Sequence, residues 1–294
     1  MKKILIIHHT DLDGAASAAI VGLAHKSDLV VFMKHNYNII INPKKLEGYD
    51  IIYAVDISFS DNPWVYELPQ LIWIDHHKTA LDFEASNDKI KSIPGYRKIG
   101  VGACELCWEY IYPNYPCPPL IQYLSAYDVW DKGRFLWQTV EKVEYGAKLA
   151  YGNNPKLIMN DLINPNFTLS KLEYDGGIIL SYLEKSYKSY INNYGMIIPN
   201  FHGNRVIAMN TQEFSSKTFE SRYDEENFDI MMAFCFCQSG IVRCSLYSTK
   251  DNIDCSSIAL YYGGGGHKGA AGFSIPWMDM IEIMKTSIPL PKIS

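Results

Sequence analysis

The sequence predicts an α/β protein of two domains: a larger N-terminal domain built on a parallel sheet, and a smaller C-terminal α/β domain joined to it by a long helix. Three short apolar runs, at residues 4–7, 51–55 and 71–74, predict the parallel sheet. Each run is rich in Ile or Val and lacks strict alternation, which is typical of strands buried on both faces. Strand-like and helix-like segments alternate through the first half, which indicates helices packed on such a sheet.

The remaining segments of the first half follow the same alternation. A small-residue segment at 15–25 is expected to be a helix, and residues 29–33 are expected to form the next strand. Another helix is expected to begin after the glycines at 100–102, and an apolar segment follows at 120–130. Two Asn-Pro pairs predict a loop region over 157–167.

A long helix is expected over 169–194, where Leu, Ile and Tyr recur at spacings of three and four residues and Gly195 follows as a cap. We take this helix as the connector, so the first domain is expected to cover 1–194 and the second 195–294. Strand-like runs in the second domain lie at 196–198, 205–209, 229–236 and 241–247.

Composition bounds the class of protein. The chain has 294 residues, of which 48% are hydrophobic and 20% charged, as in ordinary globular proteins. No apolar stretch approaches the roughly 18 residues that a membrane span needs. The seven cysteines lack a disulfide framework and the N-terminus does not resemble a secretory signal, so we expect a cytoplasmic protein. Cys104 and Cys107 lie in an apolar helical run and are expected to pack in the core.

The charge balance narrows the class of partner. The net charge is −5 and no long run of Lys or Arg is present. Proteins that grip long nucleic acid through its phosphates present a basic stripe, so we do not expect long duplexes as partners. Short oligonucleotides and small phosphorylated molecules stay open, because a few local cations are enough to hold them.

Metal-type ligands follow each of the three predicted strands. Because the carboxyl ends of parallel strands meet at one edge of a sheet, this edge would gather Asp11, Asp13, Asp56, His76 and His9. Such groups repel one another unless a cation lies between them. Carboxylates with imidazoles favour Mn²⁺ over Mg²⁺. Two such ions can share a carboxylate and stabilise both the entering and the leaving oxygen at phosphorus.

Four consecutive glycines, Gly263–Gly266, are followed by His267 and Lys268. Each glycine costs conformational entropy on folding, so we expect the run to serve ligand contact rather than packing. Backbone N–H groups in such a segment can form an anion-binding nest, and the two basic side chains would add positive charge. The alternative is a flexible linker.

These motifs together resemble the DHH phosphoesterase superfamily. The resemblance rests on His9-x-Asp11-x-Asp13-Gly14, then Asp56, Asp75-His76-His77 and Asp128, and on the glycine-rich segment, which resembles the substrate-binding motif of the DHH-associated C-terminal domain. The superfamily includes nano-RNases that degrade short oligonucleotides, dinucleotide phosphodiesterases, phosphatases of 3′-phosphoadenosine 5′-phosphate and single-strand exonucleases. It implies a two-domain fold with a metal-dependent site on the first domain.

The resemblance also implies roles for individual residues. One metal ion would be held by His9, Asp11 and Asp56, and the other by Asp13, Asp56, His76 and Asp128. Asp56 would bridge the two ions, and His76 and His77 would complete the catalytic group with it. Asp75 would orient its neighbours, and His77 would contact the scissile phosphate. Substrate would be bound by Gly264, Gly265, Gly266 and His267.

Some positions leave alternatives open. Many relatives place the first histidine four residues before the first of the paired aspartates, whereas His9 lies two residues before Asp11. The adjacent His8 competes with His9 as the first ligand. Asp131 competes with Asp128 as the last carboxylate. Tyr247 stands where relatives often carry an arginine before the glycine motif, and Arg243 could substitute for that arginine if it lies on the same strand face. We therefore include Arg243 and Tyr247 among the expected substrate-binding residues.

The predicted function is a Mn²⁺-dependent phosphodiesterase that hydrolyses short single-stranded oligonucleotides to mononucleotides by a two-metal mechanism. Mg²⁺ or Co²⁺ could occupy the same sites. The alternatives are a cyclic or linear dinucleotide phosphodiesterase and a phosphatase of 3′-phosphoadenosine 5′-phosphate. An exopolyphosphatase-like enzyme and an inactive nucleotide sensor are less favoured. No membrane partner is expected, and the long helix could serve a homodimer.

Overall fold

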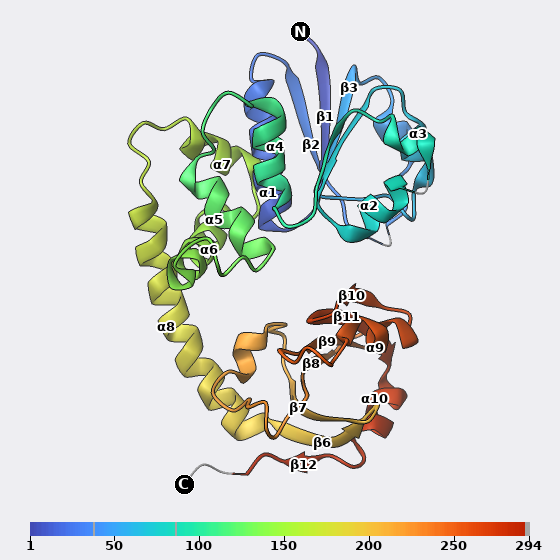
Figure 1. Ribbon diagram of the computed structural model, residues 1–294, viewed down its shortest axis with the longest axis vertical. Helices are drawn as coiled ribbons and strands as arrows, with labels where there is room; N and C mark the ends of the chain where they lie inside the picture. The colour runs from blue at the N-terminus through green and yellow to red at the C-terminus, as the bar shows by residue number, and fades with distance from the viewer. Residues whose placement is uncertain (38, 86, 292–294) are drawn as a thin grey trace. The chain divides into compact units, whose positions relative to one another are not determined.

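The computed structural model describes residues 1–37, 39–85 and 87–291 (Figure 1). The chain divides into two compact units, Met1–Leu180 and Ser181–Ser294. The division falls within helix α8 (Leu169–Tyr194), whose bounds coincide with those of the predicted connector. The sequence predicts the domain boundary at the end of this helix. Both units combine helices with a sheet, so the predicted α/β class is confirmed.

The first unit is built on a five-stranded parallel sheet. Its strands are β1 (Lys3–His8), β2 (Leu29–Lys34), β3 (Ile51–Val55), β4 (Leu71–Asp75) and β5 (Gly95–Arg97), in the order β2-β1-β3-β4-β5. Every neighbouring pair runs parallel. The strand order reverses between β1 and β3, and sheets of this order bind ligands at the carboxyl ends of the strands that flank the reversal.

Side chains of β1 alternate between two hydrophobic cores. Ile4 and Ile6 pack with helices α1 (Leu12–Ala24) and α4 (Ala103–Ile111), and this core also holds Cys104 and Cys107, as expected. Leu5 and Ile7 face the opposite core, with α2 (Lys78–Ala85), α3 (Asp88–Lys91) and the short 3₁₀ helices η1 (Pro43–Leu46) and η2 (Pro63–Glu67). Figure 1 shows these helices on the two faces of the sheet. Double burial explains why the strands are apolar throughout.

Helices α5 (Pro119–Asp128), α6 (Trp137–Tyr151) and α7 (Pro155–Leu162) complete the first unit. The expected loop over 157–167 was therefore wrong in its first half. Asn154 caps α7 by accepting a hydrogen bond from Lys156 N at 3.1 Å, and Pro155 occupies the first turn, where its missing N–H costs nothing. The first Asn-Pro pair thus begins a helix, and the second follows its end.

The second unit is built on a seven-stranded mixed sheet in the order β10-β11-β9-β8-β7-β6-β12. The strands are β6 (Met196–Phe201), β7 (Asn204–Asn210), β8 (Ile230–Phe236), β9 (Ile241–Tyr247), β10 (Gly265–His267), β11 (Ala270–Pro276) and β12 (Ile288–Pro289). Only β7 and β8 pair in parallel among these strands. Helices α9 (Cys255–Tyr261) and α10 (Trp277–Met284) supply residues to the core on one face, and the 3₁₀ helix η3 (Ser216–Phe219) to the core on the other.

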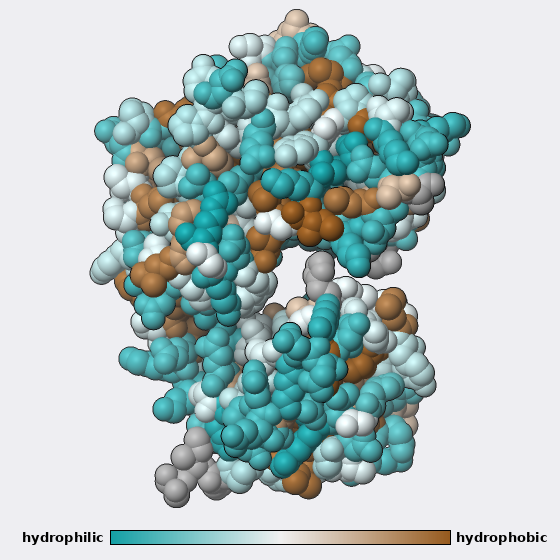
Figure 2. All heavy atoms as spheres, viewed as in Figure 1, coloured by the Kyte–Doolittle hydropathy of each residue, from teal (hydrophilic) through white to brown (hydrophobic). Residues whose placement is uncertain are grey.

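The surface of both units is mixed in character. Figure 2 shows mostly hydrophilic side chains on the visible face of each unit, with hydrophobic ones scattered among them. Among the described residues, no helix combines the length and apolarity that crossing a membrane would require.

Candidate metal centre

The loop from β1 to α1 carries the first group of candidate ligands. Asp11 is the N-cap of α1, and its Oδ1 accepts a hydrogen bond from Gly14 N at 2.9 Å. Its other carboxylate oxygen lies 2.5 Å from His9 Nδ1. A Cβ at position 14 would lie 2.6 Å from the carbonyl oxygen of His9, so only glycine lets the loop fold back this tightly. The loop thus holds His9 and Asp11 side by side.

Asp13 projects from the first turn of α1 and is fixed by a different element. Its carboxylate accepts hydrogen bonds from Ala103 N at 2.7 Å and from Cys104 N at 2.9 Å, at the amino terminus of α4. Free N–H groups at a helix start are a favourable partner for a carboxylate. The side chain is almost fully buried. Helix α4 therefore sets the orientation of this candidate ligand.

Asp56 follows β3 and lies at the centre of the group. It adopts φ 59°, a left-handed conformation that Asp tolerates better than most residues. Its side chain is only 1% exposed, and neither carboxylate oxygen has a hydrogen-bond partner among the described residues. Burial raises its pKa well above the ordinary value, and the nearby charges of Asp11 and Asp13 raise it further. A buried carboxylate whose oxygens make no hydrogen bond is a favourable ligand for a cation.

The carboxyl end of β4 brings two histidines to Asp56. Asp75 Oδ1 accepts hydrogen bonds from His76 N at 2.8 Å and from His77 N at 3.2 Å, and it lies 2.7 Å from His77 Nδ1. His76 Nε2 lies 3.2 Å from Asp56 Oδ1 and 3.3 Å from Asp128 Oδ2. Asp75 thus orients the histidine pair from beneath, as carboxylates commonly do at metal centres.

Asp128 ends α5 and faces this group. Burial raises its pKa, and the charge of Asp13 raises it further. Asp131, its rival, instead accepts a hydrogen bond from Gly133 N at 3.1 Å within the following turn. Among the described residues, Asp128 belongs to a potential metal-binding group, whereas Asp131 does not.

The structure separates the two adjacent histidines in the same way. The side chain of His8 is fully buried beneath the loop, its Nδ1 lies 2.7 Å from His9 O, and burial lowers its pKa to about 4. His9 instead faces Asp11 and Asp56. Burial alone would lower the pKa of His9, but the close contact with Asp11 and the negative charges of Asp11 and Asp56 outweigh it and raise the pKa to about 10. The same pairing lowers the pKa of Asp11 to about 2 against the effect of burial.

Within the described part of the chain, three groups of side chains bring ligand atoms within 4.8 Å of one another. They are His9 with Asp11 and Asp56; Asp13 with His76 and Asp128; and Asp56 with His76 and His77. Two of the three groups share Asp56 and two share His76. Carboxylates and imidazoles in this proportion suit divalent transition ions, and the two unpartnered oxygens of Asp56 fit such ions on both sides. The residues present therefore fit a pair of divalent cations.

The expected substrate-binding residues lie in the second unit. Gly265 pairs with Gly272 across β10 and β11, and Gly272 pairs with Ser245 on β9, so the three residues form one row. Arg243 and Tyr247 lie two residues to either side of Ser245, which places both on the face that Ser245 occupies. Arg243 therefore meets the condition of a shared strand face. Its guanidinium lies 4.8 Å from the centre of the Phe214 ring.

The expectation that the glycines serve no packing role was wrong for two of them. A Cβ on Gly264 would lie 2.1 Å from Gly272 O, and one on Gly266, which has φ 142°, would lie 2.6 Å from Ala271 Cα. Both positions are therefore glycine because β11 approaches so closely. Of the three glycines expected to bind substrate, Gly265 alone faces open space on the side of its missing Cβ. The backbone of His267 ends β10, while its side chain lies outside the described part of the chain.

Further residues beside the metal centre were not anticipated from the sequence. A pocket of about 520 Å³ is lined by Asp11, Asp13 and Asp128 together with aromatic, charged and polar side chains of α5, α6 and their flanking turns. These include Tyr127, Trp130, Glu144, Lys148 and Asn153. Their one visible sign in the sequence is the density of aromatic residues between 123 and 137.

The chain resembles two proteins along most of its length. The uncharacterised protein R106 of Acanthamoeba polyphaga mimivirus is 25% identical over an alignment of 319 positions, which covers 92% of this chain and 67% of the viral protein. Oligoribonuclease NrnB of Bacillus subtilis strain 168 is 23% identical over an alignment of 301 positions, which covers 91% of this chain and 71% of NrnB. No protein-family model matches the sequence.

Solved structures define the class of fold. The DHH domain of a protein described as a member of the s1p family of ribosomal proteins aligns with 96% of this chain and 85% of its own, at 15% identity and a TM-score of 0.61. RecJ of Thermus thermophilus in complex with Mn²⁺ aligns at 16% identity and 0.56, over 96% of this chain and 51% of RecJ. The pGpG-specific phosphodiesterase PggH of Vibrio cholerae aligns at 14% identity and 0.53, over 97% of both chains.

These alignments cover nearly the whole chain, both units included. The chain is thus a two-domain α/β protein whose parallel sheet has candidate metal-binding residues at its strand ends. It has the fold of the DHH superfamily, which confirms the resemblance predicted from its motifs.

Proposed function

We propose that the chain is a divalent-metal-dependent phosphodiesterase that hydrolyses short single-stranded oligonucleotides to mononucleotides. The observation that carries the proposal is the burial of Asp56 with two unpartnered oxygens among histidines and carboxylates from four separate segments. Such a site is costly to build unless cations neutralise it. Bound divalent ions would supply Lewis acidity and lower the pKa of coordinated water, which is the chemistry that phosphodiester hydrolysis needs.

The ligands divide between two cation positions. We propose that His9, Asp11 and Asp56 hold one ion and that Asp13, Asp56, His76 and Asp128 hold the other. The two imidazoles favour Mn²⁺ over Mg²⁺. RecJ of Thermus thermophilus is found in complex with Mn²⁺ and in complex with Mg²⁺, so this likeness in fold supports a divalent cation, and the preference for Mn²⁺ rests on the ligand types.

His77 has a role of its own in this proposal. Because Nδ1 lies 2.7 Å from Asp75 Oδ1, that nitrogen carries a hydrogen and donates it to the carboxylate. This arrangement leaves Nε2 as the atom that would contact the scissile phosphate and exchange a proton with the leaving oxygen. His76 is turned instead toward Asp56 and Asp128, in keeping with ligation. The adjacent histidines thus receive different tasks from one carboxylate.

The second unit would supply substrate contacts. We propose that Gly265, Arg243 and Tyr247 bind the nucleotide chain, Arg243 through phosphate and Tyr247 by stacking on a base. Gly264, Gly266 and the backbone of His267 hold this segment against β11. The net charge of −5 favours substrates of few nucleotides, because such substrates make few phosphate contacts. The similarity to oligoribonuclease NrnB points the same way.

A second candidate is a dinucleotide phosphodiesterase, which the full-length alignment with the pGpG-specific enzyme favours. Both candidates use the same metal-binding residues and differ only in substrate length.

The free state of all seven cysteines is consistent with action in the reducing cytoplasm, where we place the protein.

The test is a time course with Mn²⁺ on a labelled five-nucleotide RNA, a dinucleotide, a cyclic dinucleotide and 3′-phosphoadenosine 5′-phosphate. Two variants are run beside the wild type: Asp128→Asn, which alters a proposed ligand, and Asp131→Asn, its matched control in the adjacent turn. We expect a stepwise ladder from the pentamer, slowed at least about 100-fold by Asp128→Asn and unchanged by Asp131→Asn.

Cleavage of the small substrates alone would move the assignment to the dinucleotide candidate or to the phosphatase. Absence of turnover on all four substrates by the metal-loaded wild type would overturn both. Equal loss of activity in the two variants would refute the assignment of Asp128.

A further inference from the structure

The pocket beside the metal centre lies within the first unit and has a mixed lining. Asp11, Asp13 and Asp128 form the side that it shares with the proposed metal ligands. Tyr127 and Trp130 contribute aromatic surface. Its volume of about 520 Å³ is in the range of small-molecule sites, which combine apolar walls with a few polar groups.

Three aromatic rings stack around this lining. Tyr127 and Trp137 are nearly parallel, with ring centres 5.7 Å apart, and Trp130 lies 5.2 Å from Trp137 and 6.1 Å from Tyr127. Trp130 is nevertheless 49% exposed, so much of its surface stays uncovered by the other two. Lys148 Nζ lies 5.1 Å from the centre of the Tyr127 ring and 3.1 Å from Glu144 Oε1. The group thus offers both an aromatic face and an ammonium.

The backbone of Trp130 is unusual for so large a residue. It has φ 54° in the turn that ends α5, where Trp130 N donates to Tyr127 O at 3.2 Å and Asp131 N donates to Ala126 O at 2.9 Å. This is the helix-ending pattern in which glycine is the usual residue, because a side chain is strained there. Strained residues persist mainly where the surroundings and function require them. Packing of the turn alone would be served better by glycine.

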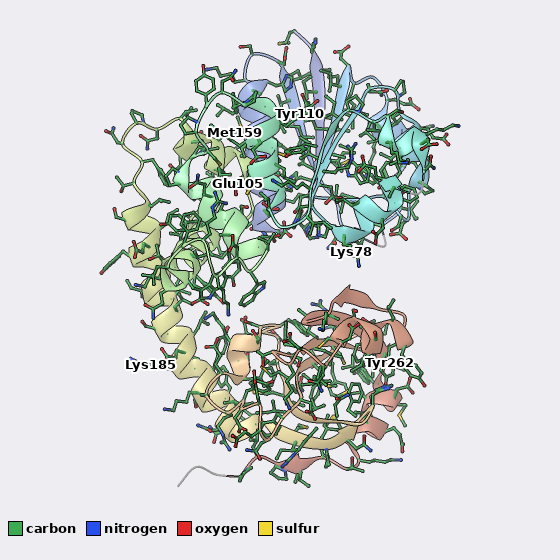
Figure 3. The ribbon with its side chains drawn as sticks, viewed as in Figure 1. Lys78, Glu105, Tyr110, Met159, Lys185 and Tyr262 are labelled. Carbon is green, nitrogen blue, oxygen red and sulfur yellow. The ribbon has the colours of Figure 1, made fainter. Side chains whose placement is uncertain are left out.

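The surrounding turn is held firmly in place. Arg134 donates two hydrogen bonds of 2.7 Å to the carboxylate of Glu105, which extends from α4 (Figure 3). Asn153, which also lines the pocket, donates from Nδ2 to Thr10 O at 2.7 Å, in the loop that carries the first proposed metal ligands. Both anchors connect the pocket wall to elements of the metal centre.

We propose that this pocket binds the nucleobase of a nucleotide adjoining the scissile phosphate, with the base stacked on Trp130. The inference rests on the proposed function and extends it by naming a base-recognition residue on the catalytic domain. Aromatic side chains stack on any base, so the site would favour nucleotides over inorganic phosphate chains without selecting a sequence. Lys148 would contact a phosphate or a polar edge of the same nucleotide.

The test compares a 5′-phosphorylated RNA dinucleotide with two analogues in which a 1′-deoxyribose abasic unit replaces one nucleoside or the other. Wild-type protein, Trp130→Gly and the control Trp277→Phe are assayed with Mn²⁺ for kcat and KM. Trp277 is a partly exposed tryptophan of the second unit. We expect the wild type to prefer the full dinucleotide over one of the abasic analogues by about 5- to 150-fold, mainly through KM.

Trp130→Gly should bring that preference close to one, and Trp277→Phe should keep it. A thermal unfolding scan of Trp130→Gly guards against misfolding, since glycine suits the backbone at this position. A wild type that hydrolyses all three substrates equally, or a folded Trp130→Gly protein that keeps the preference, would overturn the base site alone. A wild type that hydrolyses none of the three would instead overturn the proposed function.

Discussion

Replacing Asp56 with asparagine should make the metal-free protein more stable while abolishing its response to metal. In the wild type, both carboxylate oxygens are buried without hydrogen-bond partners, and like-charged Asp11 and Asp13 lie near. Asparagine keeps the shape, removes the charge and is well suited to φ 59°. An unsatisfied buried group costs about 1–3 kcal/mol, and more when it is charged. For a unit of 180 residues, this amount corresponds to a rise in Tm of about 2–12 °C.

The stability gained by metal-free Asp56→Asn over the wild type should increase with pH. The folded protein raises the pKa of Asp56 above the ordinary 3.8, so between these two pKa values the folded state binds a proton that the unfolded state has released. Stability of the metal-free wild type therefore falls as pH rises through this interval. The advantage of Asp56→Asn should be small near pH 4 and should grow toward neutral pH.

Metal should stabilise the wild type much more than Asp56→Asn. At a Mn²⁺ concentration of 100 times Kd, binding stabilises the wild type by about 2.7 kcal/mol, or about 5–11 °C in Tm. Asp56→Asn should show little of this shift. Differential scanning fluorimetry with EDTA and with Mn²⁺ measures both effects, and Asp131→Asn serves as the control that should match the wild type. A metal-free Asp56→Asn protein less stable than the wild type, or one with an undiminished Mn²⁺ shift, would refute the reasoning.

Three further predictions concern single features of the site. Mn²⁺ affinity should rise with pH between 6 and 8, because His9, with a pKa of about 10, has to lose a proton to bind metal. Calorimetry in buffers of different ionisation enthalpy should detect this proton release. Metal binding without proton release would contradict ligation by His9. Gly14→Ala should lower the free energy of unfolding by about 1–3 kcal/mol and weaken Mn²⁺ binding, because the added Cβ would clash with His9 O. An unchanged midpoint of urea unfolding would count against the tight loop. Gly266→Ala should destabilise the protein by a similar amount, because the backbone there has φ 142° and a Cβ would clash with Ala271. Gly265→Ala should leave the midpoint of urea unfolding equal to that of the wild type within error. Equal effects of the two substitutions would disprove the different packing of the two glycines.

Most residues of the candidate metal centre could be predicted from the sequence because the sheet topology determines where they lie. An apolar run predicts a buried parallel strand, and the residue after it lies at a known edge of the sheet. This logic brought together the residues that follow β1, β3 and β4. Strand topology did not identify Asp128, because the position of Asp128 depends on how α5 packs. Nor did it decide between His8 and His9, because that choice depends on which of the two side chains faces Asp11 and Asp56. The resemblance supplied Asp128, and the geometry separated the two histidines.

The failures share a different cause, which is tertiary contact that local patterns do not encode. Asn154-Pro155 signals either a loop or a helix start, and only the chain that follows decides between them. Gly264 and Gly266 lie against β11, a strand that the composition of 270–276 did not reveal. Trp130 depends on the turn after α5 and on partners from α6. None of these contacts has a periodicity that could be read along the chain.

The hydrogen bonds from α4 to Asp13 imply that the candidate site forms late in folding. They join residues 90 and 91 positions apart, so the carboxylate acquires its final direction only after the intervening strands and helices have assembled. Contacts of such separation form late, because the entropy of closing a long loop comes first. A nascent or partly unfolded chain therefore presents its aspartates and histidines as scattered, weak ligands. If the chain binds two ions as proposed, tight binding would be a property of the folded domain alone, and incomplete chains would not trap metal in the wrong geometry.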